Sequence, residues 1–202
     1  MAPSLANTRQ RVDNEIQRLE TILGGMTGIP ANLQYFVAEI VLIRTASILE
    51  IANAEIAYKV AAGASYLDGS VPTLLINCRS ISGAKTAMLT VGHAKPKQNL
   101  KWTRARFITE SVRNVIGPND NFCVTCTNFG SQISEIFKVR NFAAHRNKTS
   151  RSEFHQVIRA VYGHDLSSQL GYFLLSSNYV PVPNLRRYLV QTRVIINDLA
   201  KH

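Results

Sequence analysis

The sequence has few cysteines, few acidic side chains and no long apolar segment. Its three cysteines, Cys78, Cys123 and Cys126, are too few and too odd in number for a disulfide scaffold. No charged segment followed by an apolar one opens the chain, which together with the cysteine usage favours a reducing, cytoplasmic location. Arg44 and Glu50 interrupt the most apolar stretch before it reaches the roughly 18 residues that span a bilayer. We therefore expect a soluble protein without a membrane partner.

Sequence motifs for several common chemistries are also absent. The chain has no GxxxxGK phosphate loop, no Rossmann glycine fingerprint and no nucleophile elbow, which argues against nucleotide-fuelled and serine-hydrolase chemistry. Cys123 and Cys126 form a CxxC pair without a second ligand pair, and Cys78 and His93 would complete a zinc site only by a chance of folding. We interpret the CxxC pair as small apolar residues in a turn and expect no metal and no cofactor.

Positive charge is what the sequence has in excess. Its 23 Lys and Arg against 13 Asp and Glu give a formal net charge of +10. Residues 79–159 alone hold 14 basic and 4 acidic side chains. Such a localised excess favours a polyanionic partner, nucleic acid before a membrane surface. The alternative is that these charges only keep the protein in solution.

The apolar pattern predicts a single all-α domain over residues 1–202. A hydrophobic content of 46% suffices for one well-buried core, and the strand signal is weak throughout. The longest helix is expected between Pro30 and Gly63, because residues 31–62 contain no internal Gly or Pro. We therefore expect this helix to be the central element of a helical bundle.

The other predicted elements are shorter. Ser150 and Glu153 form a capping box before a helix that Gly163 would end. The expected helices cover residues 5–23, 31–62, 99–116, 129–145, 150–162 and 184–199, with a short helix from about residue 74. We expect connecting loops at 63–73 and 117–128, and at 82–98 a basic loop region in which a short helix stays open as an alternative.

The segment ISEIFKVRNFAAHRNK, residues 133–148, carries polar side chains on an otherwise apolar helix. On a helical wheel Arg140 falls inside the apolar stripe, and Asn141 and His145 adjoin it one turn apart. A guanidinium in such a stripe is costly unless it is paired or meets an anion. Val139 and Phe142 make the opposite side apolar as well, so we expect this helix to have two surfaces to bury.

The predicted long helix offers an internal partner for this group. Glu39 and Glu50 lie close to one line along that helix and share a face with apolar residues. A carboxylate in that face could orient Arg140 or His145.

The pattern RNFAAH resembles the signature of the HEPN superfamily of all-α proteins. The order of a long Glu-bearing helix, a basic middle, the RNxxxH helix and a terminal helix is similar to catalytic members of toxin–antitoxin and phage-defence systems. This resemblance implies a helical bundle with a long second helix, extra short helices and basic loops. A second Arg-to-His spacing, from Arg159 to His164, lacks the Asn and is broken by Gly163, so we interpret it as a coincidence.

The resemblance also implies a function. Catalytic HEPN proteins are metal-independent endoribonucleases that act as dimers and leave 2′,3′-cyclic phosphate and 5′-hydroxyl ends. His145 would transfer protons, because an unperturbed imidazole titrates near neutral pH, and Arg140 would hold the phosphate with its fork of donors. Asn141 would position His145 or the phosphate, and Glu50 would orient Arg140. The expected partners are RNA, a second copy of the chain that would cover the Val139 and Phe142 side of this helix, and an antitoxin or inhibitor protein.

The basic middle of the chain would then form a track for RNA. Trp102 lies among cations and is expected either to stack an unpaired base or to be an ordinary core residue. The side chains expected to engage phosphates are Lys95, Lys97, Lys101, Arg104, Arg106, Arg146 and Lys148.

Two other readings fit the same sequence. The first is a HEPN-like RNA-binding or scaffolding module without catalysis. The second is an unrelated helical interaction protein whose basic charge serves only solubility, in which case affinity for RNA would be weak and insensitive to salt.

Overall fold

A computed structural model describes residues 3–164 and 168–201 and confirms the all-α class. In chain order the helices are α1 (Leu5–Gly24), α2 (Ala31–Ala61), α3 (Ile81–Thr90), α4 (Ala105–Val112), α5 (Asn121–Asn128), α6 (Gly130–His145), α7 (Lys148–Tyr162), α8 (Leu170–Leu175) and α9 (Asn184–Ala200). Within the described ranges the only β pairing is an isolated antiparallel bridge between Leu74 and Ile116. No helix in these ranges combines the length and the apolar character that a membrane crossing requires.

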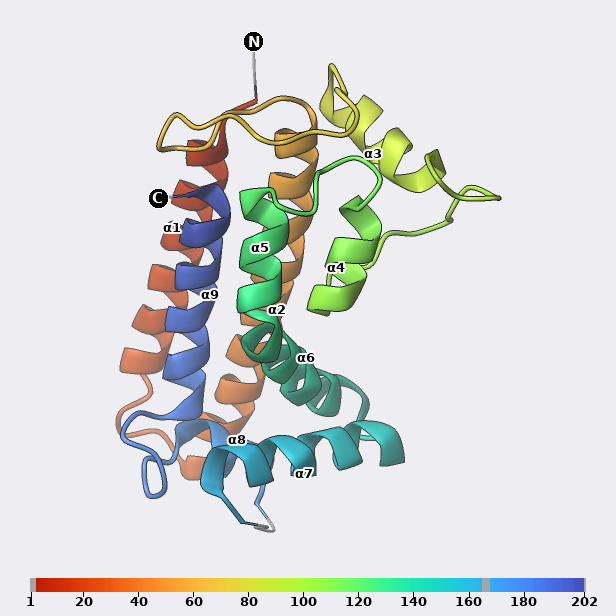
Figure 1. Cartoon of the computed structure of the whole chain (residues 1–202). Coiled ribbons are helices and arrows are strands. Elements are labelled where there is room, and N and C mark those ends of the chain that lie inside the picture. The colour runs from red at the N-terminus through yellow and green to blue at the C-terminus, as the bar shows by residue number, and fades with distance from the viewer. Residues whose placement is uncertain (1–2, 165–167, 202) are drawn as a thin grey trace.

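Three long helices, α1, α2 and α9, run side by side and form the frame of the bundle (Figure 1). α1 buries Leu5, Val12, Ile16 and Leu19, which follow one another at the spacing of a single helical stripe. This helix contacts both α2 and α9, so the stripe forms the core between the three helices. The start of α1 and the end of α9 lie at the same end of the bundle (Figure 1).

α2 is the central element and contacts α1, α3, α6, α8 and α9. Because several neighbours cover it, its buried residues are spread around the helix and do not form one stripe. Ala38, Ala46 and Ala52 have no exposed surface, and such small side chains let adjacent helices approach closely. After the helix ends, Gly63 adopts a φ of +87° that favours glycine. The predicted long helix is therefore confirmed almost to the residue.

Aromatic side chains join α6, α7 and α8 at one end of the bundle. Phe142 of α6 stacks on Phe154 of α7 with ring centroids 4.6 Å apart, and Phe154 meets Phe173 of α8 edge to face at 5.2 Å. Val139 is completely buried. The second apolar surface of α6 is thus covered within the chain, largely by α7, which lies across the bundle (Figure 1). Our interpretation of this surface as a dimer contact is therefore wrong.

Residues 117–128, predicted as a connecting loop, contain the helix α5. Asp120 is its N-cap, because its carboxylate accepts a hydrogen bond from the backbone N–H of Phe122 at 3.0 Å. The same carboxylate accepts from the Tyr66 hydroxyl and from the backbone N–H of Thr73 at 2.7 Å. This buried cap joins α5 to the segment that follows α2, a long-range contact that local sequence does not reveal.

The segment between α2 and α4 also differs from the prediction. No helix starts near residue 74, where the chain is extended at the Leu74–Ile116 bridge. α3 begins at Ile81 after Ser80, whose hydroxyl accepts from the backbone N–H of Gly83 at 3.0 Å. The predicted basic loop region 82–98 is therefore helical over its first half. α4 is shorter than the predicted helix 99–116, because residues 99–104 form a loop.

Two further differences concern the C-terminal third. α7 begins at Lys148 with Asn147 as its N-cap, because the Asn147 side chain accepts the backbone N–H of Ser150 at 2.9 Å. Ser150 is thus inside the helix, and the predicted capping box with Glu153 does not form. The short helix α8 was not predicted. Gly163 ends α7 in a left-handed conformation, as expected.

Candidate functional site

The candidate site lies on the last turns of α6. Ile133, Ile136 and Phe137 bury one side of this helix against the core. Arg140 lies half-buried, and its Nη1 donates a hydrogen bond to the Asn141 side-chain oxygen at 3.1 Å. The Arg140 Nε atom is buried and has no hydrogen-bond partner among the described residues. The guanidinium therefore retains an unsatisfied donor, which is unusual for a buried polar group.

His145 is the last residue of α6 and is exposed. Its side chain has no hydrogen bond or ion pair with any residue in the described part of the chain. The next residue, Arg146, adopts a left-handed φ of 44° and places its guanidinium 5.6 Å from the Phe142 ring centroid. The exposed imidazole is thus at the surface, one helical turn beyond Asn141.

The glutamates of α2 show no contact with Arg140 or His145 in the described part of the chain. Glu39 forms an ion pair with Arg146 instead and so fixes the end of α6 against α2. Glu50 lies half-buried, and the described chain shows no hydrogen bond or ion pair from it. That Glu50 orients Arg140 stays a prediction without a supporting contact.

Several cations of the predicted RNA track are ion-paired. Arg104 pairs with Glu153 of α7 at 2.7 Å, and Arg106 pairs with Glu110 at 2.8 Å within α4. The exposed members of the set for which no ion pair is seen in the described chain are Lys95, Lys101 and Lys148.

Trp102 is a core residue and cannot stack an RNA base. Its side chain is 6% exposed and meets Tyr58 of α2 edge to face, with ring centroids 5.5 Å apart. The aromatic that lies among the cations is Phe107, which sequence reasoning missed. Lys101 Nζ lies 5.0 Å from the Phe107 ring centroid and the Arg104 guanidinium lies 6.0 Å from it. The signal in the sequence was the alternation of basic residues before Phe107.

The cysteines and the second Arg-to-His pair offer no comparable chemistry. Cys123 and Cys126 are buried in α5, a helix where a turn was predicted, and burial raises the pKa of the Cys123 thiol to about 11. Such thiols are poor nucleophiles at neutral pH. The described residues contain no cluster of three or more metal-ligating side chains. His164 follows the helix-ending Gly163 and lies 5.8 Å from the Tyr179 ring.

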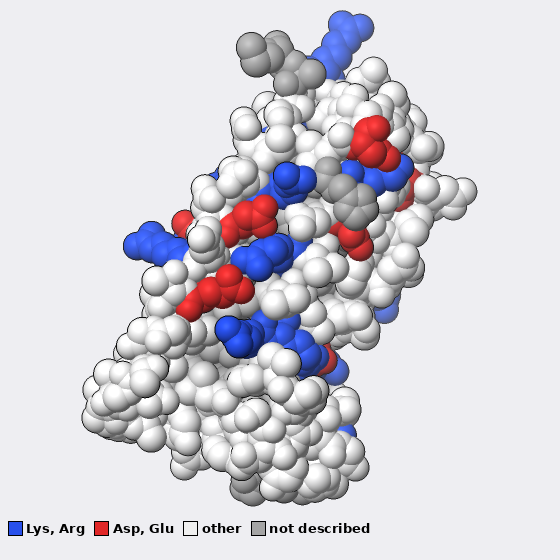
Figure 2. All heavy atoms as spheres, turned by 90° about the vertical axis from the view of Figure 1, so that its left-hand side faces the viewer, with Lys and Arg blue, Asp and Glu red and all other residues white. Residues whose placement is uncertain are grey.

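Charges on the α1 side of the molecule are balanced, in contrast to the basic middle. Basic and acidic side chains alternate over that face, and one end of it carries no charge (Figure 2). Ion pairs explain the alternation: Arg44 pairs with Glu15 at 2.8 Å, and Arg193 pairs with Glu20 at 3.1 Å. The positive excess of the chain therefore belongs mainly to α3, α4, α6, α7 and the loops between them.

Comparison with protein-family models, with curated proteins and with solved structures finds no significant match. The resemblance to HEPN proteins thus rests on the RNxxxH pattern and the order of the elements.

Proposed function

We propose that the chain is a metal-independent endoribonuclease of HEPN type that acts as a homodimer, as a toxin or phage-defence effector. The observation that carries the proposal is the half-buried Arg140, whose Nε lacks an acceptor. Its guanidinium donates a hydrogen bond to Asn141, which lies one helical turn before the exposed His145. The Nε itself is buried, so a phosphate would meet the Nη donors of this half-buried side chain, because a guanidinium binds phosphate oxygens through parallel hydrogen bonds.

The proposed reaction uses the 2′-hydroxyl of the RNA as the nucleophile. The 2′-oxygen attacks phosphorus, the bond from phosphorus to the 5′-oxygen breaks, and a 2′,3′-cyclic phosphate and a 5′-hydroxyl result. One imidazole accepts the proton from the 2′-hydroxyl, and a second, protonated imidazole donates a proton to the departing 5′-oxygen. Arg140 would stabilise the charge that develops on the phosphate oxygens.

The need for two imidazoles supports the dimer, because each chain supplies one His145 at this site. The contact surface would have to be other than the Val139 and Phe142 side, which α7 covers. α2 offers one beside the site: Phe36 and Ile40 are 61% and 48% exposed and flank Glu39, the partner of Arg146. A two-fold contact there would place apolar side chains of both copies against each other and bring two α6 ends together.

The test is RNA cleavage in the presence of EDTA by the parent protein and by His145→Ala and Arg140→Lys. Loss of a proton-transfer group should lower the rate by about 10²- to 10⁴-fold. Arg140→Lys keeps the charge but loses the fork, so it should also lose activity. His164→Ala, an exposed histidine of the second Arg-to-His spacing, is the matched control and should cleave like the parent. Equal cleavage by all four folded proteins would refute the site.

The absence of a partner that orients His145 among the described residues favours a second function, a non-catalytic HEPN-like RNA-binding module. General bases are usually held by a further hydrogen bond that fixes the ring tautomer. Folded, dimeric protein that binds RNA and leaves it intact would establish this alternative.

A further inference from the structure

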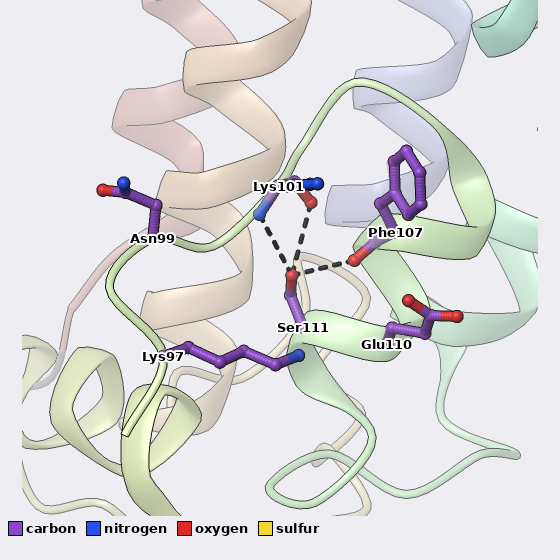
Figure 3. Close-up of a pocket in the computed structure, with 6 residues that line it drawn as sticks. All are labelled: Lys97, Asn99, Lys101, Phe107, Glu110 and Ser111. Carbon is purple, nitrogen blue, oxygen red and sulfur yellow. Dashed lines mark hydrogen bonds between the residues drawn. The ribbon is translucent and has the colours of Figure 1, made fainter. Parts of the chain in front are cut away.

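A pocket of about 230 Å³ lies between the loop before α4 and α4 itself, away from Arg140 and His145 along the chain. Its walls are formed by Lys97, Asn99, Lys101, Phe107, Glu110 and Ser111 (Figure 3). Lys97 and Lys101 come from the loop, whereas Phe107 and Glu110 come from the helix. The Asn99 amide points away from the other labelled side chains (Figure 3).

The pocket is held in shape by hydrogen bonds beneath it. The buried Ser111 hydroxyl donates to the Phe107 carbonyl at 2.8 Å and accepts from the backbone N–H of Lys101 at 3.2 Å (Figure 3). The other end of the loop is tied to α3, because the backbone N–H of Lys97 donates to the Leu89 carbonyl at 2.8 Å. A ligand therefore meets walls that are already placed, which lowers the entropy cost of binding.

The lining combines an aromatic face with ammonium groups. Lys101 Nζ lies 5.0 Å from the centroid of the half-buried Phe107 ring, and the Arg104 guanidinium approaches the same ring at 6.0 Å. The negative charge of Glu110 is offset by Arg106, because its Oε1 accepts a hydrogen bond from Arg106 Nε at 2.8 Å. The local charge available to a ligand is therefore positive. Both cations lie over the Phe107 ring, so a base that stacks there takes the place of the Lys101 ammonium, which is then free to meet a phosphate.

We propose that this pocket binds one unpaired nucleotide of an RNA strand, with the base stacked on Phe107 and the adjoining phosphate held by Lys97 and Lys101. The volume is below the roughly 300–1,000 Å³ of drug-sized sites, so the pocket would take the base of one nucleotide and leave the rest of the strand at its mouth. Stacking on an aromatic ring together with cationic contact to the backbone is how proteins bind single strands. The choice of RNA over other anions rests on the function proposed above. The binding site itself does not depend on catalysis.

The experiment is a fluorescence anisotropy titration of a single-stranded, 2′-O-methylated RNA of about 12 nucleotides, a length within known single-strand site sizes. The methylated strand cannot be cleaved through its 2′-oxygen, so binding is measured alone. The full chain is compared with Lys97→Gln/Lys101→Gln and with Phe107→Leu. The control for charge is Arg9→Gln/Arg18→Gln, which removes the same two charges from α1, and the control for the ring is Phe129→Leu, another half-buried phenylalanine.

Loss of one stacked base should weaken binding by about 5- to 100-fold in Phe107→Leu. The double lysine variant should bind at least about tenfold more weakly. Its salt dependence should be shallower by about 0.7 in the logarithmic slope, since both lysines hold the same phosphate and each phosphate contact on a single strand contributes about 0.7. Affinities within twofold of the matched controls would overturn the proposal. Binding of a nucleoside 5′-monophosphate as tight as that of the strand would also overturn it, because the site would then be one for free nucleotides.

The failure of this inference is distinguishable from the failure of the proposed function. RNA that binds through the pocket but is never cleaved by the parent protein would refute the nuclease and leave the pocket standing. If RNA is cleaved in a manner that depends on His145, but the pocket variants bind RNA like their controls, the pocket proposal would be refuted and the nuclease would stand.

Discussion

Gly171 of α8 packs directly against Tyr35 of α2, and replacing it with alanine should destabilise the protein. A Cβ at Gly171 would lie 2.2 Å from the Tyr35 Cβ and 2.8 Å from its Cα, whereas ordinary contacts start near 3.4 Å. The clash is with the backbone and the root of a side chain, which no rotamer change relieves. α8 would have to move away from α2 by about 1 Å, although its Phe173 and Leu174 are fully buried.

The expected cost is about 3 kcal/mol, the upper part of the range for overpacked sites, because the shift also loosens the burial of α8. Gly24→Ala is the matched control. Gly24 is the last residue of α1, and no neighbouring atom lies within 4 Å of a Cβ built there. Alanine at this position should be neutral or stabilise the protein by up to about 1 kcal/mol.

Urea unfolding followed by circular dichroism measures both variants. If the free energy of unfolding falls by about 2 kcal/mol per molar urea, Gly171→Ala should lower the urea midpoint by about 1.5 M and leave this slope unchanged. The Gly24→Ala midpoint should equal or exceed that of the parent. If Gly171→Ala unfolds at the same urea concentration as Gly24→Ala, then α8 does not sit on α2 as described.

Two further predictions concern the half-buried Glu55 and the buried Tyr66. Burial raises the pKa of Glu55, but hydrogen bonds led by that from Lys59 outweigh it and lower the pKa to about 2. Glu55 therefore stabilises the fold above pH 4.5 and loses this effect as the pH falls toward 2. At neutral pH the parent should be about 2 kcal/mol more stable than Glu55→Gln. Urea unfolding at a series of pH values should show this difference vanish between pH 4.5 and 2. Tyr66→Phe removes the hydroxyl that donates to Asp120 at the start of α5, and thermal or urea unfolding should show a loss of about 1.5–3 kcal/mol; an unchanged midpoint would contradict a buried bond there.

Helix ends that depend on backbone chemistry were predictable from the sequence. Gly63 and Gly163 occur where the chain takes a positive φ, and no other residue takes that conformation as cheaply. Pro30 precedes a helix start, where its fixed φ is already suitable. These signals are local, so they act in the same way whatever the rest of the chain does.

Elements that depend on distant partners were not predictable. α5 begins directly after its N-cap Asp120, whose carboxylate also meets Tyr66 and Thr73, more than forty residues earlier in the chain. Trp102 is buried because Tyr58 of α2 lies against it, although its sequence neighbours are basic. Local composition predicted a connecting loop in the first region and left the burial of Trp102 open in the second, since it contains no information on what the fold brings alongside.

The candidate site shows the same division. The side chains of Arg140 and Asn141 are hydrogen-bonded because one helix presents them next to each other, and the motif alone predicts that they are close. The relation of Glu50 to Arg140 depends on how α2 and α6 cross, which a helical wheel does not determine. Nor can a wheel tell burial against another helix of the same chain from burial against a second copy, so the side of α6 that carries Phe142 was misassigned.

The corner between α6 and α7 consists of Arg146 and Asn147 alone. At its other contacts α7 holds Arg104, next to the Phe107 pocket, through Glu153. α7 thus contacts both the end of the helix that bears His145 and the wall of the pocket. Substitutions that change the orientation of α7 should impair the His145 site and the Phe107 pocket together. Changes on the outer side of α1 should leave both intact.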